Sequence, residues 1–325
     1  MITRTLFLIS IVHLLGCQSP SQKEAVVPKD KVILVIHGGA GTITREKMSA
    51  TMDSIYRSVL QTSLRTGYDI LEKGGTSCDA VIAAISLLED NPLFNAGVGA
   101  VFTSEMTTEL DASIMRGSDL NAGAVAGVKT VKNPIKAAFL VMEKSSHVMF
   151  SGAGADAFAA EQGLEIVEPS YFSTQNRLER LQQIQKEHGT VGVVALDTEG
   201  NLCAGTSTGG MTNKKWGRIG DSPIIGAGTY AKNATCGVSC TGYGEYFIRT
   251  ATAYNVSALM EYKGLDIKTA AELALKQTYD LGGLGGLIAL DTAGNVAMPF
   301  STEGMYRGYI TLSGAVKLLI YGDEE

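Results

Sequence analysis

A nine-residue segment occurs twice in this chain of 325 residues. Residues 194–202 read VALDTEGNL and residues 288–296 read IALDTAGNV, and a Ser-Thr pair follows each copy, at 207–208 and 301–302. Each copy places an apolar run before a Gly-Asn turn and a second apolar run after it, which is the pattern of a β-hairpin. The copies begin 94 residues apart, which is too far for a solenoid repeat. We therefore expect two hairpins that pair in one sheet, or in two facing sheets, of a single sandwich.

The composition is that of a globular protein that does not bind nucleic acid. Hydrophobic residues make up 45% of the chain and charged residues 18%, so a large core can form and disorder is excluded. The length fits one large domain or two modest ones. The net charge of −6 has the wrong sign for binding phosphate backbones. The 38 glycines lie in tight clusters, which indicates sharp turns and backbone that another group approaches closely.

Residues 1–17 have the pattern of a secretion signal. Arg4 precedes an apolar stretch that is too short to span a bilayer as a helix. Its end, Leu-Leu-Gly-Cys at 14–17, resembles the lipobox of bacterial lipoproteins, which implies that Cys17 is lipidated; the alternative is an ordinary cysteine in a conventional signal peptide. The polar residues 18–30 are expected to form a tether. We therefore expect an exported bacterial lipoprotein, anchored to a membrane of the periplasm or cell envelope.

Four cysteines remain after Cys17, and their spacing selects no disulfide. They are Cys78, Cys203, Cys236 and Cys240. An even number in an oxidising export route allows three connectivities. Cys236 and Cys240 lie in a predicted strand, on one face and about 13 Å apart at roughly 3.3 Å per residue, which is too far for a bridge. We expect four buried thiols. With only four His and no paired spacing, zinc is not expected either.

Apolar periodicity and turn signals predict alternating strands and helices. Thr76 and Asp79 form a capping box that opens a helix. Residues 164–189 lose apolar periodicity, so we expect an exposed linker without ordered structure there. The other predicted elements are strands over 31–36, 110–115 and 122–128 and helices over 46–71, 77–88, 134–144 and 245–262.

Several glycine-rich motifs occur in unbroken order between residues 31 and 307. They are HGGAG at 37–41, FNAGVGAVFT at 94–103, LDASIM at 110–115, TVGVVALDTEGNLCAGTSTGG at 190–210, GRIGDSPIIGAGTYA at 217–231 and SCTGYGE at 239–245. Together they resemble the plant-type asparaginase and isoaspartyl peptidase family of N-terminal nucleophile hydrolases. The resemblance implies an α+β fold in which residues 31–325 form one domain, a four-layer αββα sandwich of two mainly antiparallel sheets flanked by helices.

The resemblance also implies that the chain cuts itself between Gly189 and Thr190. The products would be an α subunit ending at Gly189 and a β subunit of residues 190–325, and relatives assemble as dimers of this two-fragment unit. A threonine hydroxyl needs a base within hydrogen-bond reach. The α-amino group that cleavage frees on Thr190 has a reference pKa of about 7.7–8.0, so a single cut creates both nucleophile and base. Gly189 lacks a Cβ and tolerates the strained geometry of an intramolecular attack.

Further site residues follow from the same resemblance. Thr208 would orient the new amino group. The Thr241 hydroxyl and the Gly242 N–H would hold the tetrahedral intermediate, ahead of a helix whose N-terminal dipole favours an oxyanion. The remaining implied substrate contacts are Arg218 to the α-carboxylate, Asp221 to the α-ammonium, and Gly244 and Asn95 close to the nucleophile.

No cofactor is expected for catalysis, but the resemblance implies a structural sodium ion. Backbone carbonyl oxygens suit such a hard cation. The residues that match the sodium loop of relatives are Leu88, Glu89, Asn91, Phe94, Ala96 and Val98.

These expectations define a self-processing threonine amidohydrolase. It would hydrolyse L-asparagine to L-aspartate and ammonia and cleave β-aspartyl (isoaspartyl) dipeptides, in both cases through attack of Thr190 on the side-chain acyl carbon of an aspartyl unit. A close alternative is a glycosylasparaginase, which uses the same nucleophile and head-group contacts on N-glycan linkages. A different class is an uncleaved lipoprotein that only binds amino acids, which predicts one full-length band and no ammonia release.

Overall fold

The computed structural model describes residues 30–182 and 189–324. The predicted signal peptide, Cys17 and all but the last residue of the predicted tether lie outside these ranges. Across the described ranges, no helix is both long and apolar enough to cross a membrane.

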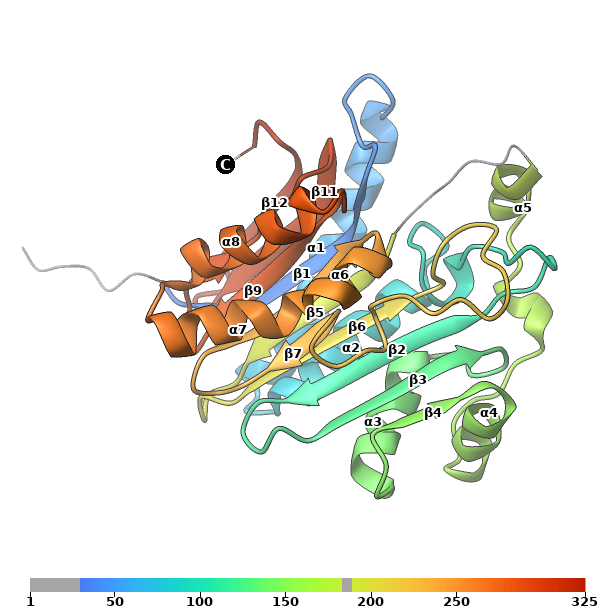
Figure 1. The fold of residues 1–325 in the computed structure, drawn as a ribbon, viewed down its shortest axis with the longest axis horizontal. Coiled ribbons are helices and arrows are strands. Elements are labelled where there is room, and N and C mark those ends of the chain that lie inside the picture. The colour runs from blue at the N-terminus through green and yellow to red at the C-terminus, as the bar shows by residue number, and fades with distance from the viewer. Residues whose placement is uncertain (1–29, 183–188, 325) are drawn as a thin grey trace, which may run out of the picture.

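Two sheets form the centre of the molecule (Figure 1). The larger sheet has the strand order β12-β11-β1-β5-β6-β2-β3-β4 and is antiparallel except for the pair β3 and β4. The smaller sheet has the order β10-β9-β8-β7 and is antiparallel. The strands of the larger sheet are β1 (Val32–Gly41), β2 (Leu110–Arg116), β3 (Ala122–Val128), β4 (Met149–Ser151), β5 (Val191–Leu196), β6 (Leu202–Thr208), β11 (Gly304–Thr311) and β12 (Val316–Tyr321). Those of the smaller sheet are β7 (Thr229–Ala231), β8 (Cys236–Gly242), β9 (Gly285–Asp291) and β10 (Val296–Ala297).

Helices cover the two outer faces of this pair of sheets (Figure 1). One group packs on the larger sheet and consists of α1 (Ala50–Glu72), α2 (Ser77–Glu89), α3 (Pro134–Lys144) and α4 (Gly152–Glu161). The other packs on the smaller sheet and consists of α6 (Gly244–Thr250), α7 (Thr252–Lys263) and α8 (Ile267–Asp280). The remaining short elements are η1 (Gly97–Gly99), η2 (Pro169–Phe172) and α5 (Gln175–Gln182).

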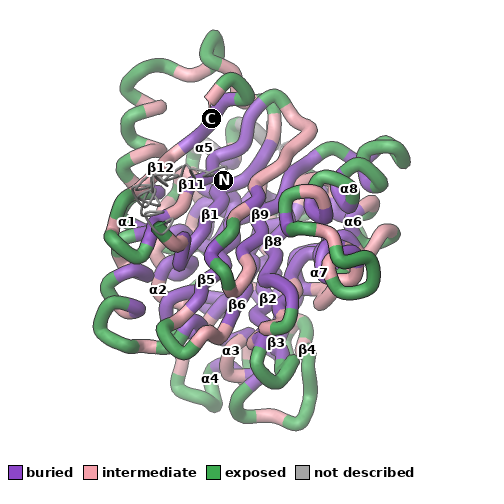
Figure 2. The backbone as a smooth tube through the Cα atoms, turned by 90° about the vertical axis from the view of Figure 1, so that its left-hand side faces the viewer, coloured by how far each residue is buried: buried purple, intermediate pink, exposed green. Residues whose placement is uncertain are grey.

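Three apolar clusters fill the spaces between these layers. The first includes Leu64 of α1 and Ile85 of α2, packed against the larger sheet. The second lies between the sheets and includes Val194 and Ile288. The third packs the smaller sheet against its helices, with Phe247 fully buried. Figure 2 shows the result, with buried strands at the centre and exposed stretches along the outer helices. The α+β architecture with two mainly antiparallel sheets is confirmed, and its layers are stacked αββα.

The two copies of the repeated segment form hairpins in different sheets. The first copy builds β5 and β6, and the second builds β9 and β10. β5 and β9 contact each other across the sandwich, so two hairpins of one sandwich are confirmed, and of the two alternatives left open the facing sheets are the one observed. Every residue of β5 and β6 is buried because α2 covers one face of the larger sheet and the smaller sheet covers the other. Any hydroxyl on these strands therefore lies inside the molecule.

Three predicted elements differ from those observed. The helix predicted over 46–71 begins only at Ala50, because the Ser49 hydroxyl accepts from the Met52 N–H and caps the helix there. The single helix predicted over 245–262 is two helices, because Ala251 has a left-handed φ of 45° and its N–H bonds the carbonyls of Phe247 and Ile248, which ends α6. The first strand does not stop at residue 36. Pairing with β11 carries it on through the glycines to Gly41.

The prediction of a linker without ordered structure over 164–189 is wrong for the part that the structure describes. This part contains η2 and α5. Phe172 is completely buried, and the guanidinium of Arg177 donates to the Gly99 carbonyl oxygen at 2.7 Å. The polar composition of the segment gives no sign of the contacts made by Phe172 and Arg177. Both residues contact distant parts of the chain and not one another.

The expectation of four free thiols is also wrong. Cys78 near the start of α2 forms a disulfide with Cys203 on β6, with Cα atoms 5.2 Å apart. Cys236 and Cys240 are free and buried on β8, in agreement with the prediction that they do not bridge. The packing of α2 on β6 brings Cys78 to Cys203. The spacing of the cysteines along the chain does not indicate this pairing.

Candidate active site

The peptide bond between Gly189 and Thr190 lies immediately before β5, and its carbonyl group is held by two side chains. The Gly189 carbonyl oxygen accepts hydrogen bonds from Asn95 Nδ2 at 2.8 Å and from Thr208 Oγ1 at 2.9 Å. Two donors on one carbonyl oxygen withdraw electron density from its carbon and stabilise any negative charge that develops on the oxygen. The carbonyl group at the predicted cut is therefore polarised by two donors.

The hydroxyl of Thr190 lies in the same group of contacts. Thr190 is buried, and its Oγ1 donates to Thr208 Oγ1 at 3.1 Å. The pairing of β5 with β6 sets Val191 opposite Ser207, which places the two threonines side by side at the end of the hairpin. The Thr208 hydroxyl also accepts from the Gly210 N–H at 2.9 Å. The hairpin thus brings the Thr190 hydroxyl, the Thr208 hydroxyl and the Gly189 carbonyl group together.

Asn95 is fixed by bonds at both ends of its amide. Its Oδ1 accepts from the Val101 N–H at 3.0 Å, and its Nδ2 also donates to the Gly210 carbonyl oxygen at 2.7 Å. These bonds orient the amide so that Nδ2 faces the scissile carbonyl. Asn95 lies 94 residues before Gly189, so only tertiary structure brings the pair together.

A buried histidine that the sequence analysis did not place in the site lies on the other side of Thr190. His37 on β1 bonds the Thr190 carbonyl oxygen through Nδ1 at 3.1 Å and Ser239 Oγ through Nε2 at 2.9 Å. Burial lowers the pKa of His37 to about 3, so the imidazole is neutral at physiological pH. We infer that it positions Thr190 and does not take its proton. The Ser239 hydroxyl continues the network to Thr206 at 2.7 Å.

The predicted oxyanion residues lie at the end of β8. Thr241 is fully buried, and its Oγ1 has no hydrogen-bond partner among the described residues. Gly242 has a φ of 144°, a conformation open to glycine and unfavourable for other residues. Gly242 lines a pocket of about 1100 Å³ together with Asn95 and Gly189. An unpaired buried hydroxyl beside this pocket is a donor available to a substrate.

The predicted head-group residues form a second cluster around the start of α6. Arg218 makes a two-pronged ion pair with Glu245, with both N–O distances at 2.9 Å. A Cβ on Gly244 would lie 2.8 Å from Asp221 Oδ1 and 3.0 Å from Arg218 Nη2, so the absence of a side chain there is what allows the three residues to meet. Asp221 is buried, and its Oδ2 has no hydrogen-bond partner within the described ranges.

The two clusters are joined through buried hydroxyls but do not share the pocket. Ser113 on β2 donates to the Ser222 carbonyl oxygen, next to Asp221, and to Thr229 Oγ1 at 2.8 Å. Thr229 in turn donates to Thr206 on β6 at 2.6 Å. Of the described residues, those that line the pocket with Gly189 include neither Arg218 nor Asp221. The structure thus groups Asn95, Thr190 and Thr208 around the Gly189 carbonyl group. The buried hydroxyls of Ser113, Thr229 and Thr206 lie between this group and the head-group cluster.

The titration of Asp221 predicts a pH dependence of substrate binding. Burial raises the pKa of Asp221 to about 7, so its carboxylate is available to an ammonium group above that pH and is lost below it. We expect KM for L-asparagine to rise as pH falls from 8 to 5.5, by up to about tenfold per unit below pH 7, as one proton requires. Measuring KM across this range checks the prediction.

Two variants control this pH measurement. Asp221→Asn should have a high KM and no pH step, whereas Asp280→Asn, at an exposed ion pair on α8, should behave like the parent protein. A pH step of the same size in Asp221→Asn would contradict the assignment.

The loop expected to hold sodium turns some of its carbonyl oxygens inward. A Cβ on Gly97 would overlap the Glu89 carbonyl oxygen, and one on Gly99 would overlap the Phe94 carbonyl oxygen. The Glu89 side chain is not directed into this loop, because its Oε1 accepts from Ser207 Oγ at 2.7 Å. Burial raises its pKa to about 8. Backbone carbonyl oxygens are the type of ligand that suits a hard cation. Among the described residues, no cluster of three or more His, Cys, Asp or Glu offers a transition-metal site.

Inside this αββα sandwich, a threonine at the start of a central strand follows a polarised peptide bond. This arrangement is consistent with the N-terminal nucleophile hydrolases. Comparison with known proteins identifies the family. A family model described as asparaginase matches residues 30–188 and 182–320. The chain belongs to this plant-type asparaginase and isoaspartyl peptidase family.

Similar proteins come from bacteria and animals. The isoaspartyl peptidase of Escherichia coli K12 is 52% identical over 297 residues, which cover 86% of this chain and 92% of the relative. The isoaspartyl peptidase of Salmonella typhimurium is 50% identical over 298 residues, with 86% and 95% covered. The isoaspartyl peptidase/L-asparaginase of Xenopus laevis is 40% identical over 286 residues, with 85% and 91% covered.

Proposed function

We propose that the chain cuts its own Gly189–Thr190 bond and that the freed Thr190 is the nucleophile of an isoaspartyl peptidase/L-asparaginase. The enzyme class and activity follow from the family and from the names of its close relatives. The observation that carries self-cleavage is the Gly189 carbonyl oxygen, which accepts from Asn95 and Thr208 beside the Thr190 hydroxyl.

Self-cleavage proceeds by transfer of the Gly189 acyl group within the chain. Thr190 Oγ attacks the Gly189 carbonyl carbon, and its proton passes through the Thr208 hydroxyl, which faces it at 3.1 Å, to the Thr190 peptide nitrogen. Asn95 Nδ2 and Thr208 Oγ1 stabilise the oxyanion. The peptide nitrogen leaves with a proton, and an ester joins Gly189 to Thr190. Water then hydrolyses this ester, which yields a carboxylate on Gly189 and both a free hydroxyl and a free amino group on Thr190.

The mature site repeats the same chemistry on a substrate. The α-amino group of Thr190 removes the proton from its own hydroxyl. The hydroxyl attacks the side-chain acyl carbon of an asparagine or β-aspartyl unit. The Thr241 hydroxyl and the Gly242 N–H stabilise the tetrahedral intermediate, and ammonia or an amino acid leaves. Water hydrolyses the acyl-enzyme to L-aspartate. Arg218 binds the substrate α-carboxylate and Asp221 its α-ammonium.

The leaving group distinguishes this function from glycosylasparaginase. The purified cleaved protein is expected to hydrolyse β-aspartyl-leucine and L-asparagine with much higher kcat/KM than asparagine-linked N-acetylglucosamine. Release of aspartate measured for all three substrates in parallel tests this. A preference for the glycosylated substrate would establish the alternative. An uncleaved protein that binds asparagine without releasing ammonia would show that the chain is only a binder.

A structural sodium ion is part of the proposal. It would be held by backbone oxygens of the loop formed by Leu88, Glu89, Asn91, Phe94, Ala96 and Val98. Its role would be to keep the loop that carries Asn95 in place, with no part in the reaction. Replacing sodium by a bulky organic cation at equal ionic strength should lower the melting temperature. An unchanged melting temperature would remove the ion from the proposal.

The N-terminal segment supports an exported, lipid-anchored enzyme. In this proposal residues 1–17 are the signal and Cys17 is the lipid site, and the enzyme would act in the bacterial periplasm or cell envelope. Radiolabelled palmitate should enter the parent protein and not the Cys17→Ala variant. Equal labelling of both would contradict the anchor.

The assembly is proposed to be a dimer of two-fragment units, on the basis of the family alone. Light scattering of the cleaved protein should then give a mass close to twice that of one processed chain. A mass equal to one chain would exclude the dimer.

A further inference from the structure

The one disulfide among the described residues crosses the point at which the chain is proposed to be cut. Cys78 lies near the start of α2, and Cys203 lies on β6. Residue 78 precedes the Gly189–Thr190 bond and residue 203 follows it. The two sulfur atoms therefore belong to different fragments once the chain is cleaved.

We propose that the mature enzyme is one covalent unit, with its α and β fragments linked by Cys78–Cys203. This inference rests on the proposed self-cleavage, which creates the two fragments. The other cysteines cannot take this role, because Cys236 and Cys240 both lie on β8 within the β fragment. If Cys17 is lipidated, the same bond attaches the catalytic fragment covalently to the fragment that bears the lipid.

Noncovalent contacts place the two cysteines together independently of the bond. The N–H and Oγ of Ser77 both bond Asp197 Oδ2, at 3.1 and 3.0 Å. Asp197 directly follows β5, on the β-fragment side of the cut, so these bonds also join the two fragments. α2 packs along β5 and β6, and Cys203 is completely buried. The helix is thus already held in the position from which Cys78 reaches Cys203.

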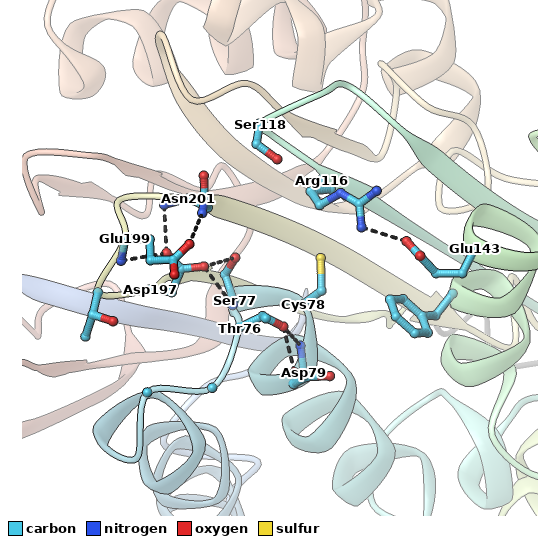
Figure 3. A pocket seen from close by; sticks show the side chains of 14 residues that line it. Thr76, Ser77, Cys78, Asp79, Arg116, Ser118, Glu143, Asp197, Glu199 and Asn201 are labelled. Carbon is cyan, nitrogen blue, oxygen red and sulfur yellow. Dashed lines mark hydrogen bonds and ion pairs between the residues drawn. The ribbon is translucent and has the colours of Figure 1, made fainter.

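Of the two cysteines, only Cys78, which is 4% exposed, lies beside a surface pocket. Cys78 lines a pocket of about 270 Å³ with Ser77, Asp197, Arg116 and Glu143 (Figure 3). Formation of the bond removes two hydrogens from the thiols, and these reduce a second disulfide, such as that of a thiol–disulfide oxidoreductase or oxidised glutathione, to two thiols. The exchange begins at Cys78, because Cys203 is enclosed behind it.

The link changes what happens when the enzyme unfolds. Without it, the unfolded fragments separate and must meet again to refold. With it, each fragment faces its partner at an effective concentration of about 1 mM, typical of a short tether. At ~1 μM protein this is an advantage on the order of 10³-fold in re-encounter. Recovery of activity should therefore depend much less on protein concentration while the disulfide is intact than after its loss.

Denaturing gels of the cleaved full chain test the proposal. The folded protein is equilibrated with oxidised glutathione, free thiols are blocked, and samples are run with and without reductant. The expected result is two fragments with reductant and one linked species of full-chain size without it. A tryptic peptide pair containing Cys78 and Cys203 should be found only without reductant. Two separate fragments without reductant would overturn the proposal while leaving self-cleavage intact.

The reduced sample separates this failure from failure of the proposed function. One full-length band with reductant would mean that the chain is not cut, and both proposals would fall. Cys78→Ser should give two fragments in both lanes, whereas Cys236→Ser, at a buried free cysteine, should run like the parent protein. After denaturation and dilution, activity recovered from Cys78→Ser should fall as protein concentration falls. Recovery that is independent of concentration in this variant, or a linked species in its unreduced lane, would contradict the link.

Discussion

Replacement of Thr190 by alanine is expected to leave the chain in one piece and to lower asparagine turnover by about 10⁴-fold or more, as removal of a nucleophile does in other acyl-transfer enzymes. In the proposed mechanism the Thr190 hydroxyl, which donates to Thr208, attacks Gly189, so its loss should stop processing. Because processing also frees the amino base, the variant lacks both nucleophile and base. A reducing denaturing gel and an ammonia-release assay measure the two effects.

Thr190→Ser is the matched control for this experiment. Serine retains the hydroxyl and, after cleavage, the α-amino group, so this variant should process and turn over, though more slowly. Thr198→Ala, in the turn between β5 and β6, should behave like the parent protein. A Thr190→Ala chain that still splits after Gly189 would eliminate the proposed mechanism.

Replacement of Asn95 by alanine is expected to slow self-cleavage by about 10²- to 10³-fold, the usual cost of losing one oxyanion donor. The variant removes the Nδ2 that lies 2.8 Å from the Gly189 carbonyl oxygen. Thr208 remains as the second donor, so processing should be slowed and not abolished. The fraction of cleaved chain measured over time on reducing gels gives the rate.

Asn255→Ala serves as the control. The side-chain amide of Asn255 forms an exposed hydrogen bond to Gln277 and no other among the described residues. It should process at the parent rate. Cleavage of Asn95→Ala at the parent rate would show that the Asn95 bond is structural. Circular dichroism spectra that match those of the parent protein show that slow processing does not arise from misfolding.

Local sequence signals predicted the elements that depend on near neighbours. α3 spans the predicted residues 134–144, because Pro134 opens the helix and its apolar positions repeat at helical spacing. Thr76 caps α2 as expected, since its hydroxyl accepts from the Asp79 N–H. Thr190 and Thr208 flank a predicted hairpin, so the pairing of its two strands also predicts that these residues are neighbours. These features depend on residues close in the sequence.

Other features depended on contacts between distant segments. Ala251 splits a helix that periodicity predicts as continuous, because packing of α6 and α7 on the smaller sheet requires a left-handed residue. The polar segment around Arg177 is ordered because it bonds a loop far from it in sequence. Ser239 and Thr241 are two residues apart on β8, so both hydroxyls lie on one face of the strand. This spacing was the one sequence signal of a buried polar network. His37 gave no such signal within its glycine motif.

The repeated hairpin was determined by the sequence alone. Its turn and its alternating apolar residues specify local pairing, and the motif order identifies the family. Only the tertiary structure decided that the two hairpins lie in opposite sheets, that Asn95 meets Gly189, and that Cys78 meets Cys203. Each of these contacts joins residues about a hundred positions apart. Such contacts form because burial of apolar faces stacks the layers, and that stacking is a property of the whole chain.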